Sequence, residues 1–360
     1  MGDFSLAISN CNLGLISDPN EAKFYLLRGI AKASLRQFDP AIKDYDHAIL
    51  LNPKFESAYL NRGAAKTQTG DYFGAVADYS ITLNLNSNLS DAYYSRANVQ
   101  QYLGNYTNAM SDFSLAIKTK TNNVWAYANR AALGLALSGR SDLALADMEQ
   151  AIRFDPQNPT LYCNRAGMLF RDGKYKEAIA DCEKSLKLQP GYYRAYNGLG
   201  VFYNDLCQLP LALDNFNKSI AISASQPDVE HRIYLIRMRL GDKEEVKREI
   251  MDRCSKLANA SKENGIYTPT VDRIEPFLAG LISDSDLLRG ATNYVFEKTE
   301  RNTQYCQACY YIGMKRLMDG NTNGAMAALN ESAATQIQFG EVGYEEMQSS
   351  KNELDLLKAK

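Results

Sequence analysis

The 360-residue chain has only two histidines, His47 and His231, and a formal net charge of only −2. Neither histidine belongs to a Ser–His–Asp set, and the sequence contains no phosphate loop or metal-ligand cluster. A histidine-based catalytic centre, a metal site and a bound cofactor are therefore not expected, and the chain is predicted to be non-catalytic. The near balance of charges argues against a nucleic-acid binder, which would carry a basic face.

Long apolar runs and a secretory leader are also missing. No stretch approaches the roughly 18 apolar residues of a membrane span. The first residues, MGDFSLAISNC, show no basic segment followed by an apolar one. Seven cysteines, an odd number without a dense framework, indicate a reducing compartment. These features favour the cytoplasm, with the periplasm left open if a leader has been removed.

A recurring phrase fills the first two thirds of the chain. It reads AYLNRGAAKTQTGDY at Ala58–Tyr72, with copies at Phe24–Phe38, Ala92–Tyr106, Ala126–Arg140, Leu161–Tyr175 and, more distantly, Ala195–Leu209. With the tyrosine of each copy as position 4, the copies are spaced by 34, 34, 34, 35 and 34 residues. The extra residue lies between Leu137 and Asp142, in a predicted turn. A fixed period of this length indicates a stack of similar units.

Each copy shows the residues that two tightly packed helices need. Position 8 is always glycine or alanine, and the second half of each copy has an invariant alanine: Ala41, Ala75, Ala109, Ala144, Ala178 and Ala212. Small residues at these places let antiparallel helices approach closely. Pro53, Pro156 and Pro190 then stop the second helix, because proline cannot continue it.

This pattern resembles the tetratricopeptide repeat, a helix–turn–helix unit of 34 residues. Six copies cover residues 22–226. The resemblance implies an all-α fold, a right-handed superhelical solenoid whose first helices line a concave groove. That groove would be the place where a protein or extended peptide binds.

The remaining segments are predicted from the same frame. Residues 1–21 read as the second helix of a half repeat, with Phe4, Ile8 and Leu15 lacking cover. Solenoid ends normally need a polar cap. Either the chain was cut from something longer, which we favour, or another molecule, such as a second copy, covers this end.

Beyond the sixth copy the period fades. Residues 227–265 read as a degenerate repeat with helices at Asp228–Leu240 and Lys243–Asn264. Residues 266–304 read as a helical insert (Thr268–Ile282 and Asp284–Arg301), 305–340 as a last repeat, and 341–360 as a capping helix bearing Tyr344, Met347, Leu354 and Leu357. The run PFLAGLISDSDLLRGA, followed by YCQACYYIGMKRLMDGN, is similar to the C-terminal part of several bacterial tetratricopeptide proteins, which favours a bacterial source.

Position 7 is arginine in five copies, and position 23 is aspartate in the same five. The pairs are Arg28 and Asp44, Arg62 and Asp78, Arg96 and Asp112, Arg130 and Asp147, and Arg165 and Asp181. In the sixth copy both change, to Leu199 and Asn215. This joint change favours a salt bridge within each repeat over an anion-binding stripe of arginines.

The groove-facing positions of the first helix suggest a binding site. Asn61, Asn129 and Asn164 share position 6, and this incomplete ladder resembles the peptide-binding asparagines of O-linked N-acetylglucosamine transferase repeat arms. An amide offers both donor and acceptor to a peptide backbone; alternatively, these asparagines only cap or solvate the helix surface. Further predicted groove residues are Tyr94, Asn98, Gln101, Trp125, Arg194 and Asn197. The Lys/Arg/Asn clamp of the Hsp70/Hsp90 co-chaperone class is not found.

Cys306 and Cys309 form a CxxC on a predicted helix, but a zinc site needs four ligands. No second pair follows, so a packing role is favoured. We therefore predict a protein- or peptide-binding scaffold that uses the groove of repeats two to five. The alternatives are the recognition arm of a larger enzyme, such as a glycosyltransferase, and a self-associating structural protein.

Overall fold

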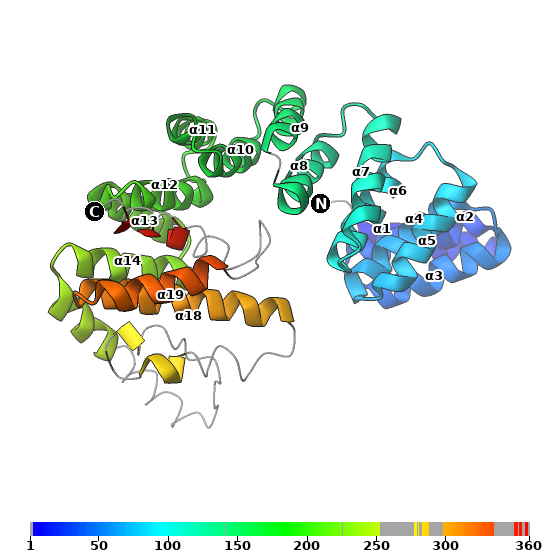
Figure 1. Cartoon of the computed structure of the whole chain (residues 1–360). Coiled ribbons are helices and arrows are strands. Elements are labelled where there is room, and N and C mark those ends of the chain that lie inside the picture. Colours follow the sequence, from blue (N-terminus) through cyan, green and yellow to red (C-terminus); the bar gives the residue numbers. More distant parts are fainter. Residues whose placement is uncertain are drawn as a thin grey trace. The chain divides into compact units, whose positions relative to one another are not determined.

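A computed structural model describes residues 3–139, 141–224, 226–252 and 298–334, with short segments at 277–278, 280, 283–287, 349–351, 353–354 and 357–358. The described residues form helices and turns, without a strand among them. They divide into two compact units (Figure 1), Met1–Gly134 with Ala146–Asp155, and Leu135–Leu145 with Pro156–Lys360. Each unit is described by itself.

Unit one is a series of antiparallel helix pairs. The half repeat contributes one helix, and each complete repeat contributes a first and a second helix. They are α1 (Phe4–Ser17), α2 (Ala22–Ser34), α3 (Phe38–Leu51), α4 (Glu56–Thr69), α5 (Tyr72–Leu85), α6 (Ser90–Tyr102) and α7 (Tyr106–Thr119). The division between the units falls within α8 (Val124–Ser138) and α9 (Ser141–Phe154). The predicted all-α solenoid of helix–turn–helix repeats is confirmed.

The turn inside each repeat is made by a residue with left-handed backbone. In repeat two this is Gly70, with φ of 85°, and Asp71 then caps α5 by accepting the Gly74 N–H at 2.9 Å. Glycine adopts this conformation without steric cost. In repeats one and six the equivalent residues are Arg36 and Cys207, which have φ of 60° and 56°.

The close approach of the two helices depends on position 8. In repeat two, a Cβ added to Gly63 would lie 3.0 Å from the Tyr79 ring, and in repeat six one added to Gly200 would lie 2.5 Å from Phe216. The invariant alanine of the second helix is buried in every repeat. Where position 8 of the six repeats is glycine, an aromatic side chain of the second helix therefore fills the space beside it.

Unit two continues with helix pairs and a C-terminal cluster. Its helices are α10 (Pro159–Arg171), α11 (Tyr175–Leu188), α12 (Tyr193–Asp205), α13 (Leu209–Ile222), α14 (Pro227–Arg239), α18 (Lys298–Met318) and α19 (Thr322–Ala334). Residues 243–252 are also helical. Leu235, Val246, Phe277, Ile312 and Leu354 belong to one buried apolar cluster, which joins segments far apart in the sequence.

The last described residues of the chain are packed into unit two. Glu353 forms an ion pair of 3.0 Å with Arg239 on α14, and Ser349 donates to Asp205 on α12. Leu354 is buried, and Leu357 packs against the same cluster. Tyr344 and Met347 of the predicted capping helix lie outside the described residues, as does most of the predicted helix Thr268–Ile282.

One predicted boundary differs from the structure. The division between residues 304 and 305 falls inside α18, which runs unbroken from Lys298 to Met318 because its sequence has no proline and no early glycine to interrupt it. The predicted helix Asp284–Arg301 likewise extends past the first residue of α18. Cys309 of the CxxC is buried, with its thiol 3.7 Å from Glu331, whereas the Cys306 side chain lies outside the described residues.

Candidate functional site

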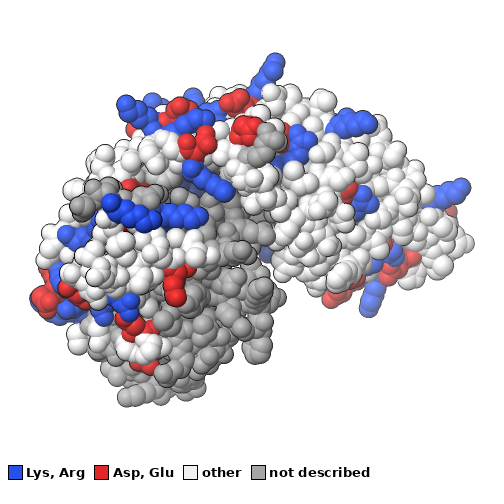
Figure 2. Space-filling model, in the orientation of Figure 1, with Lys and Arg blue, Asp and Glu red and all other residues white. Residues whose placement is uncertain are grey.

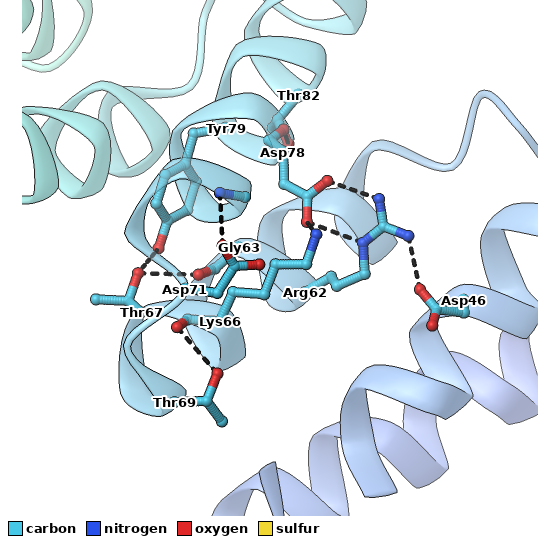
Figure 3. Close-up of polar contacts among 11 residues, drawn as sticks. Asp46, Arg62, Gly63, Lys66, Thr67, Thr69, Asp71, Asp78, Tyr79 and Thr82 are labelled. Atoms are coloured by element: carbon cyan, nitrogen blue, oxygen red, sulfur yellow. Dashed lines mark hydrogen bonds and ion pairs between the residues drawn. The ribbon is translucent and has the colours of Figure 1, made fainter. Parts of the chain in front are cut away.

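The arginine at position 7 and the aspartate at position 23 of repeats one to five form a salt bridge between the two helices of each repeat. Figure 3 shows the arrangement in repeat two, where Arg62 Nε and Nη2 donate to the two carboxylate oxygens of Asp78 at 2.8 and 2.6 Å. Lys66 Nζ lies 3.0 Å from the same carboxylate. The four other predicted pairs form in the same way. The prediction of pairing within each repeat is confirmed.

Four of these arginines also reach the preceding helix pair or half repeat, a contact that was not predicted from the sequence. Arg62 Nη1 donates to Asp46 of repeat one at 2.7 Å (Figure 3). Equivalent bonds join Arg28 to Asn12, Arg96 to Ser80 and Arg130 to Ser114. The sequence contains a pattern that could have predicted these bonds, because a residue able to accept a hydrogen bond stands 16 residues before each of the four arginines.

These contacts occupy the guanidinium groups. The hydrogen bond that Arg62 donates to Asp78 raises the pKa of Arg62 above its ordinary value, so the guanidinium stays charged. Each guanidinium also lies over the ring of the tyrosine three residues earlier, at 5.4 Å for Arg62 and Tyr59. The arginines therefore hold the helices together, and this use leaves little support for an anion-binding stripe.

Repeat six lacks this arrangement. Leu199 is buried in an apolar cluster with Phe202 and Phe216. Asn215 turns its amide back to its own helix and donates to the Leu211 carbonyl at 2.8 Å. The apolar side chain and the locally satisfied amide replace the ion pair without leaving a buried charge.

The outward surface of the first helices in unit one carries most of the predicted site. We call it the first-helix face; it comprises positions 5, 6, 9, 12 and 13 on α2, α4 and α6, and Ala128, Asn129 and Ala132 on α8. Consecutive first helices are neighbours, since α2 contacts α4 and α4 contacts α6. Trp125, 44% exposed, stands one turn before Asn129 on α8.

Three predicted residues meet on this face. Asn129 Nδ2 donates to Asn98 Oδ1 at 2.9 Å and to the Tyr94 hydroxyl at 3.4 Å. Tyr94 is held in turn by its ring contact with Phe113, at 6.0 Å between centroids. These bonds leave the Asn98 Nδ2 donor and the Asn129 Oδ1 acceptor without a partner among the described residues. A donor and an acceptor side by side are what an extended peptide backbone can bind.

The other predicted residues are placed separately. Asn61 Nδ2 donates to the Ser57 carbonyl of its own helix at 2.7 Å, so half of its amide serves the local backbone. Gln101 lies on α6, half-buried. Asn164, Arg194 and Asn197 belong to unit two. Asn164 is exposed, Arg194 Nε donates to the Tyr193 hydroxyl at 3.4 Å, and Asn197 has its side-chain oxygen buried without a partner.

Charged patches, metal-ligand groups and membrane-spanning helices are further features that could indicate a function. Lysine and arginine lie among aspartate and glutamate in small mixed groups, with wide uncharged areas between them, on the face drawn in Figure 2. The described part of the chain has no group of three or more histidine, cysteine or acidic residues that could hold a metal ion. Among the same residues, no helix is long and apolar enough to span a membrane.

Family models of the tetratricopeptide repeat match residues 22–55, 90–123 and 159–192. The Hsp70-Hsp90 organizing protein of Triticum aestivum is 32% identical over 88 residues, covering 24% of this chain and 15% of that protein. The small glutamine-rich tetratricopeptide repeat-containing protein of Dictyostelium discoideum is 23% identical over 209 residues, covering 57% of this chain and 52% of that one. The chain thus spans from about one sixth to about half of these relatives.

Solved structures share the fold. A tetratricopeptide repeat protein from Parabacteroides merdae superposes with a TM-score of 0.51 at 22% identity, over 65% of this chain and 93% of that one. A chain of the APC/C hetero-tetramer Cut9-Hcn1 gives 0.55 at 15% identity, over 65% and 46%. At these identities the likeness concerns the fold alone.

Proposed function

The chain is built of tetratricopeptide repeats, and we propose that it is a protein-binding scaffold whose first-helix face holds an extended peptide segment of a partner. Binding centres on Asn98, Trp125 and Asn129. The observation that carries the proposal is the hydrogen bond from Asn129 to Asn98, which fixes both amides and leaves one donor and one acceptor open.

Fixed amides favour binding for an energetic reason. A mobile asparagine must lose rotamer freedom before it can hold a ligand, and this loss weakens the complex. Asn129 is already restrained by Asn98 and Tyr94, so its side chain loses rotamer freedom on folding and not on binding. A peptide backbone can then pair its carbonyl with Asn98 Nδ2 and its N–H with Asn129 Oδ1, whatever its side chains.

Trp125 supplies the apolar part of the same site. It is the only tryptophan of the chain, and it is 44% exposed next to the buried Ala126. Tryptophan is favoured at the centre of binding sites, because a large rigid ring covers much area at little entropic cost. The role of a protein-binding scaffold is also supported by a relative, which bears the name Hsp70-Hsp90 organizing protein.

The test starts from a displayed library of random peptides of about 12 residues, which span about 40 Å when extended. Peptides selected on the full chain are measured by fluorescence anisotropy. Trp125→Ala with Asn129→Ala should weaken binding at least about 10-fold, as expected for the loss of a central aromatic and an amide.

The matched control carries Phe73→Ala with Asn108→Ala, on the second helices α5 and α7. Phe73 is 78% exposed, and Asn108 is exposed, so both changes should leave the fold and the affinity intact. Far-UV circular dichroism checks that all variants stay helical. Equal affinities of wild type and the Trp125/Asn129 variant, or a library that yields no binder, would refute the proposal.

Self-association through α1 is a second candidate function. Leu6, Leu13 and Ile16 are 55, 64 and 79% exposed, and α1 holds no charged residue. Phe4, Ile8 and Leu15, which the sequence predicts to lack cover, are half-buried. A variant with Leu13→Ser and Ile16→Ser should lower the mass in light scattering; a monomeric mass for both wild type and variant would rule this candidate out.

A further inference from the structure

The first-helix face of unit one has no charged side chain. None occurs at positions 5, 6, 9, 12 or 13 of α2, α4 and α6, or among the residues of α8 that belong to this face. In their place stand amides, hydroxyls, aromatic rings and aliphatic side chains. The exposed or half-exposed ones include Leu27, Asn61, Ala64, Asn98 and Gln101. Over the whole chain, by comparison, 23% of the residues are charged.

The charges that these helices do carry are directed elsewhere. Arg28, Arg62, Arg96 and Arg130 all pair with aspartates of the second helices. Lys32 and Lys66 join two of these pairs, at 2.7 and 3.0 Å. What remains is confined to the first two residues of a helix, at Lys23, Glu56 and Asp91.

The two ends of the face differ in character. On α2 it presents Leu27, which is 42% exposed, beside the half-buried Ile30. On α6 and α8 it presents the asparagine pair. Trp125, 44% exposed, borders the face at repeat position 2, where α2 and α6 carry Lys23 and Asp91. An extended segment lying across the first helices would therefore meet an aliphatic surface, then amides, then an aromatic ring.

A charged ligand side chain would gain nothing on this surface. It would lose hydration on binding, and no side chain of opposite sign stands at the face positions to compensate for that loss. An uncharged segment would lose no such hydration and would bury apolar area against Leu27 and Trp125. The absence of charge thus selects against acidic and basic partners alike.

We propose that the first-helix face of unit one takes an extended peptide segment whose contacting side chains are uncharged, with an aliphatic residue against Leu27 and a ring or proline against Trp125. This inference rests on the proposed peptide-binding function. It adds the chemical class of the ligand, and it excludes a peptide held through its terminal carboxylate or through phosphate groups.

The first test is the salt dependence of binding. A selected peptide should bind with a Kd that changes less than about twofold between about 50 and 500 mM NaCl, because screening acts only on charge pairs. The selected sequences should also be depleted of lysine, arginine, aspartate and glutamate relative to the starting library. Affinity that falls steeply with salt, together with charged consensus residues, would overturn the inference while leaving the peptide-binding function standing.

The second test introduces charge at Ala64, an exposed position on α4 between Asn61 and Gln68. Ala64→Lys and Ala64→Glu both keep good helix formers at an exposed site, so both should fold. For an uncharged ligand, each should weaken binding about 10-fold, because each adds a charge that the peptide would desolvate. Ala64→Gln is the uncharged control of similar length and should change Kd less than about threefold.

The outcomes separate the two claims. Opposite effects of Ala64→Lys and Ala64→Glu would show a charged ligand and overturn the inference alone. Equal weakening by both, with Ala64→Gln near wild type, supports it. If no library peptide binds the wild-type chain, the proposed function and the inference that rests on it are both rejected.

Discussion

Repeat two and repeat six pack the same pair of helices with different chemistry. In repeat two, Arg62 joins Asp78 of its own repeat and Asp46 of the preceding one. In repeat six, Leu199 and Asn215 occupy the equivalent positions, with the leucine in an apolar cluster and the amide bonded to its own helix. The fold therefore does not require the ion pair. It requires that positions 7 and 23 are compatible: either both are charged and paired, or neither is charged.

The largest expected effect comes from breaking that match in repeat two. Arg62→Leu alone leaves Asp78, whose side chain is 2% exposed, with only Lys66 as a partner. It should lower the free energy of unfolding by about 3 kcal/mol, since a buried charge loses its main partner. Hydrogen exchange of the α4 and α5 amides measures the local effect.

The matched control is Arg62→Leu with Asp78→Asn, which copies repeat six into repeat two. It should recover at least about half of the loss, because no unpaired carboxylate remains. If the double variant is as unstable as the sum of the two single ones, the two positions do not interact and the comparison fails.

The converse change tests repeat six. Leu199→Arg should destabilise α12 and α13 by about 2 kcal/mol, because the guanidinium meets Asn215 in place of a carboxylate. Adding Asn215→Asp should restore most of this, and Glu183, which stands 16 residues before Leu199, supplies the acceptor in the preceding repeat. Thermal unfolding followed by circular dichroism distinguishes the single from the double variant; no recovery in the latter contradicts the prediction.

The turns give a smaller difference between the same two repeats. Cys207 holds φ of 56° in repeat six, whereas Gly70 holds 85° in repeat two. Cys207→Gly should stabilise the chain by about 1 kcal/mol, because a side chain in left-handed backbone is strained. Gly70→Ala should destabilise it by a similar amount. Urea unfolding measures both, and a shift of the same sign in the two variants would contradict the explanation.

The smallest effect concerns an exposed ion pair after repeat six. Arg237 lowers the pKa of Glu249, whose side chain is 45% exposed, through hydrogen bonds of 2.7 and 3.0 Å. A lowered pKa adds stability above the ordinary value of about 4.3, and this is lost as the pH falls through the folded-state pKa. Glu249→Gln should cost only a few tenths of a kcal/mol at neutral pH and nothing in acid. An equal cost at both pH values would exclude the pair as its cause.

The repeats and the pairs within them could be predicted because each copy repeats the same local information. Periodic tyrosines, small residues and jointly changing arginine and aspartate specify helices and a contact between them. The bond from Arg62 to Asp46 was missed because position 25 varies among aspartate, asparagine and serine, which share only the ability to accept a hydrogen bond.

The candidate site stays a prediction. Sequence placed Asn61 and Asn129 in one ladder, but Asn61 bonds to its own helix while Asn129 bonds to Asn98. Side-chain torsions decide between these outcomes, and repeat position does not encode them. The C-terminal contacts of Glu353 and Ser349 were also beyond prediction, because they join segments more than 100 residues apart that share no repeat frame.

The bond that each arginine makes to the preceding repeat also shapes how the molecule comes apart. Because each bond links neighbouring repeats, the stability of one repeat depends on whether its neighbour is folded. A repeat therefore unfolds more readily once the repeat beside it has unfolded. From Arg28 to Arg130 every repeat is tied in this way to the one before it. Unfolding of this stretch should therefore spread from one end, and a single defective repeat in the middle would let unfolding start there and spread in both directions.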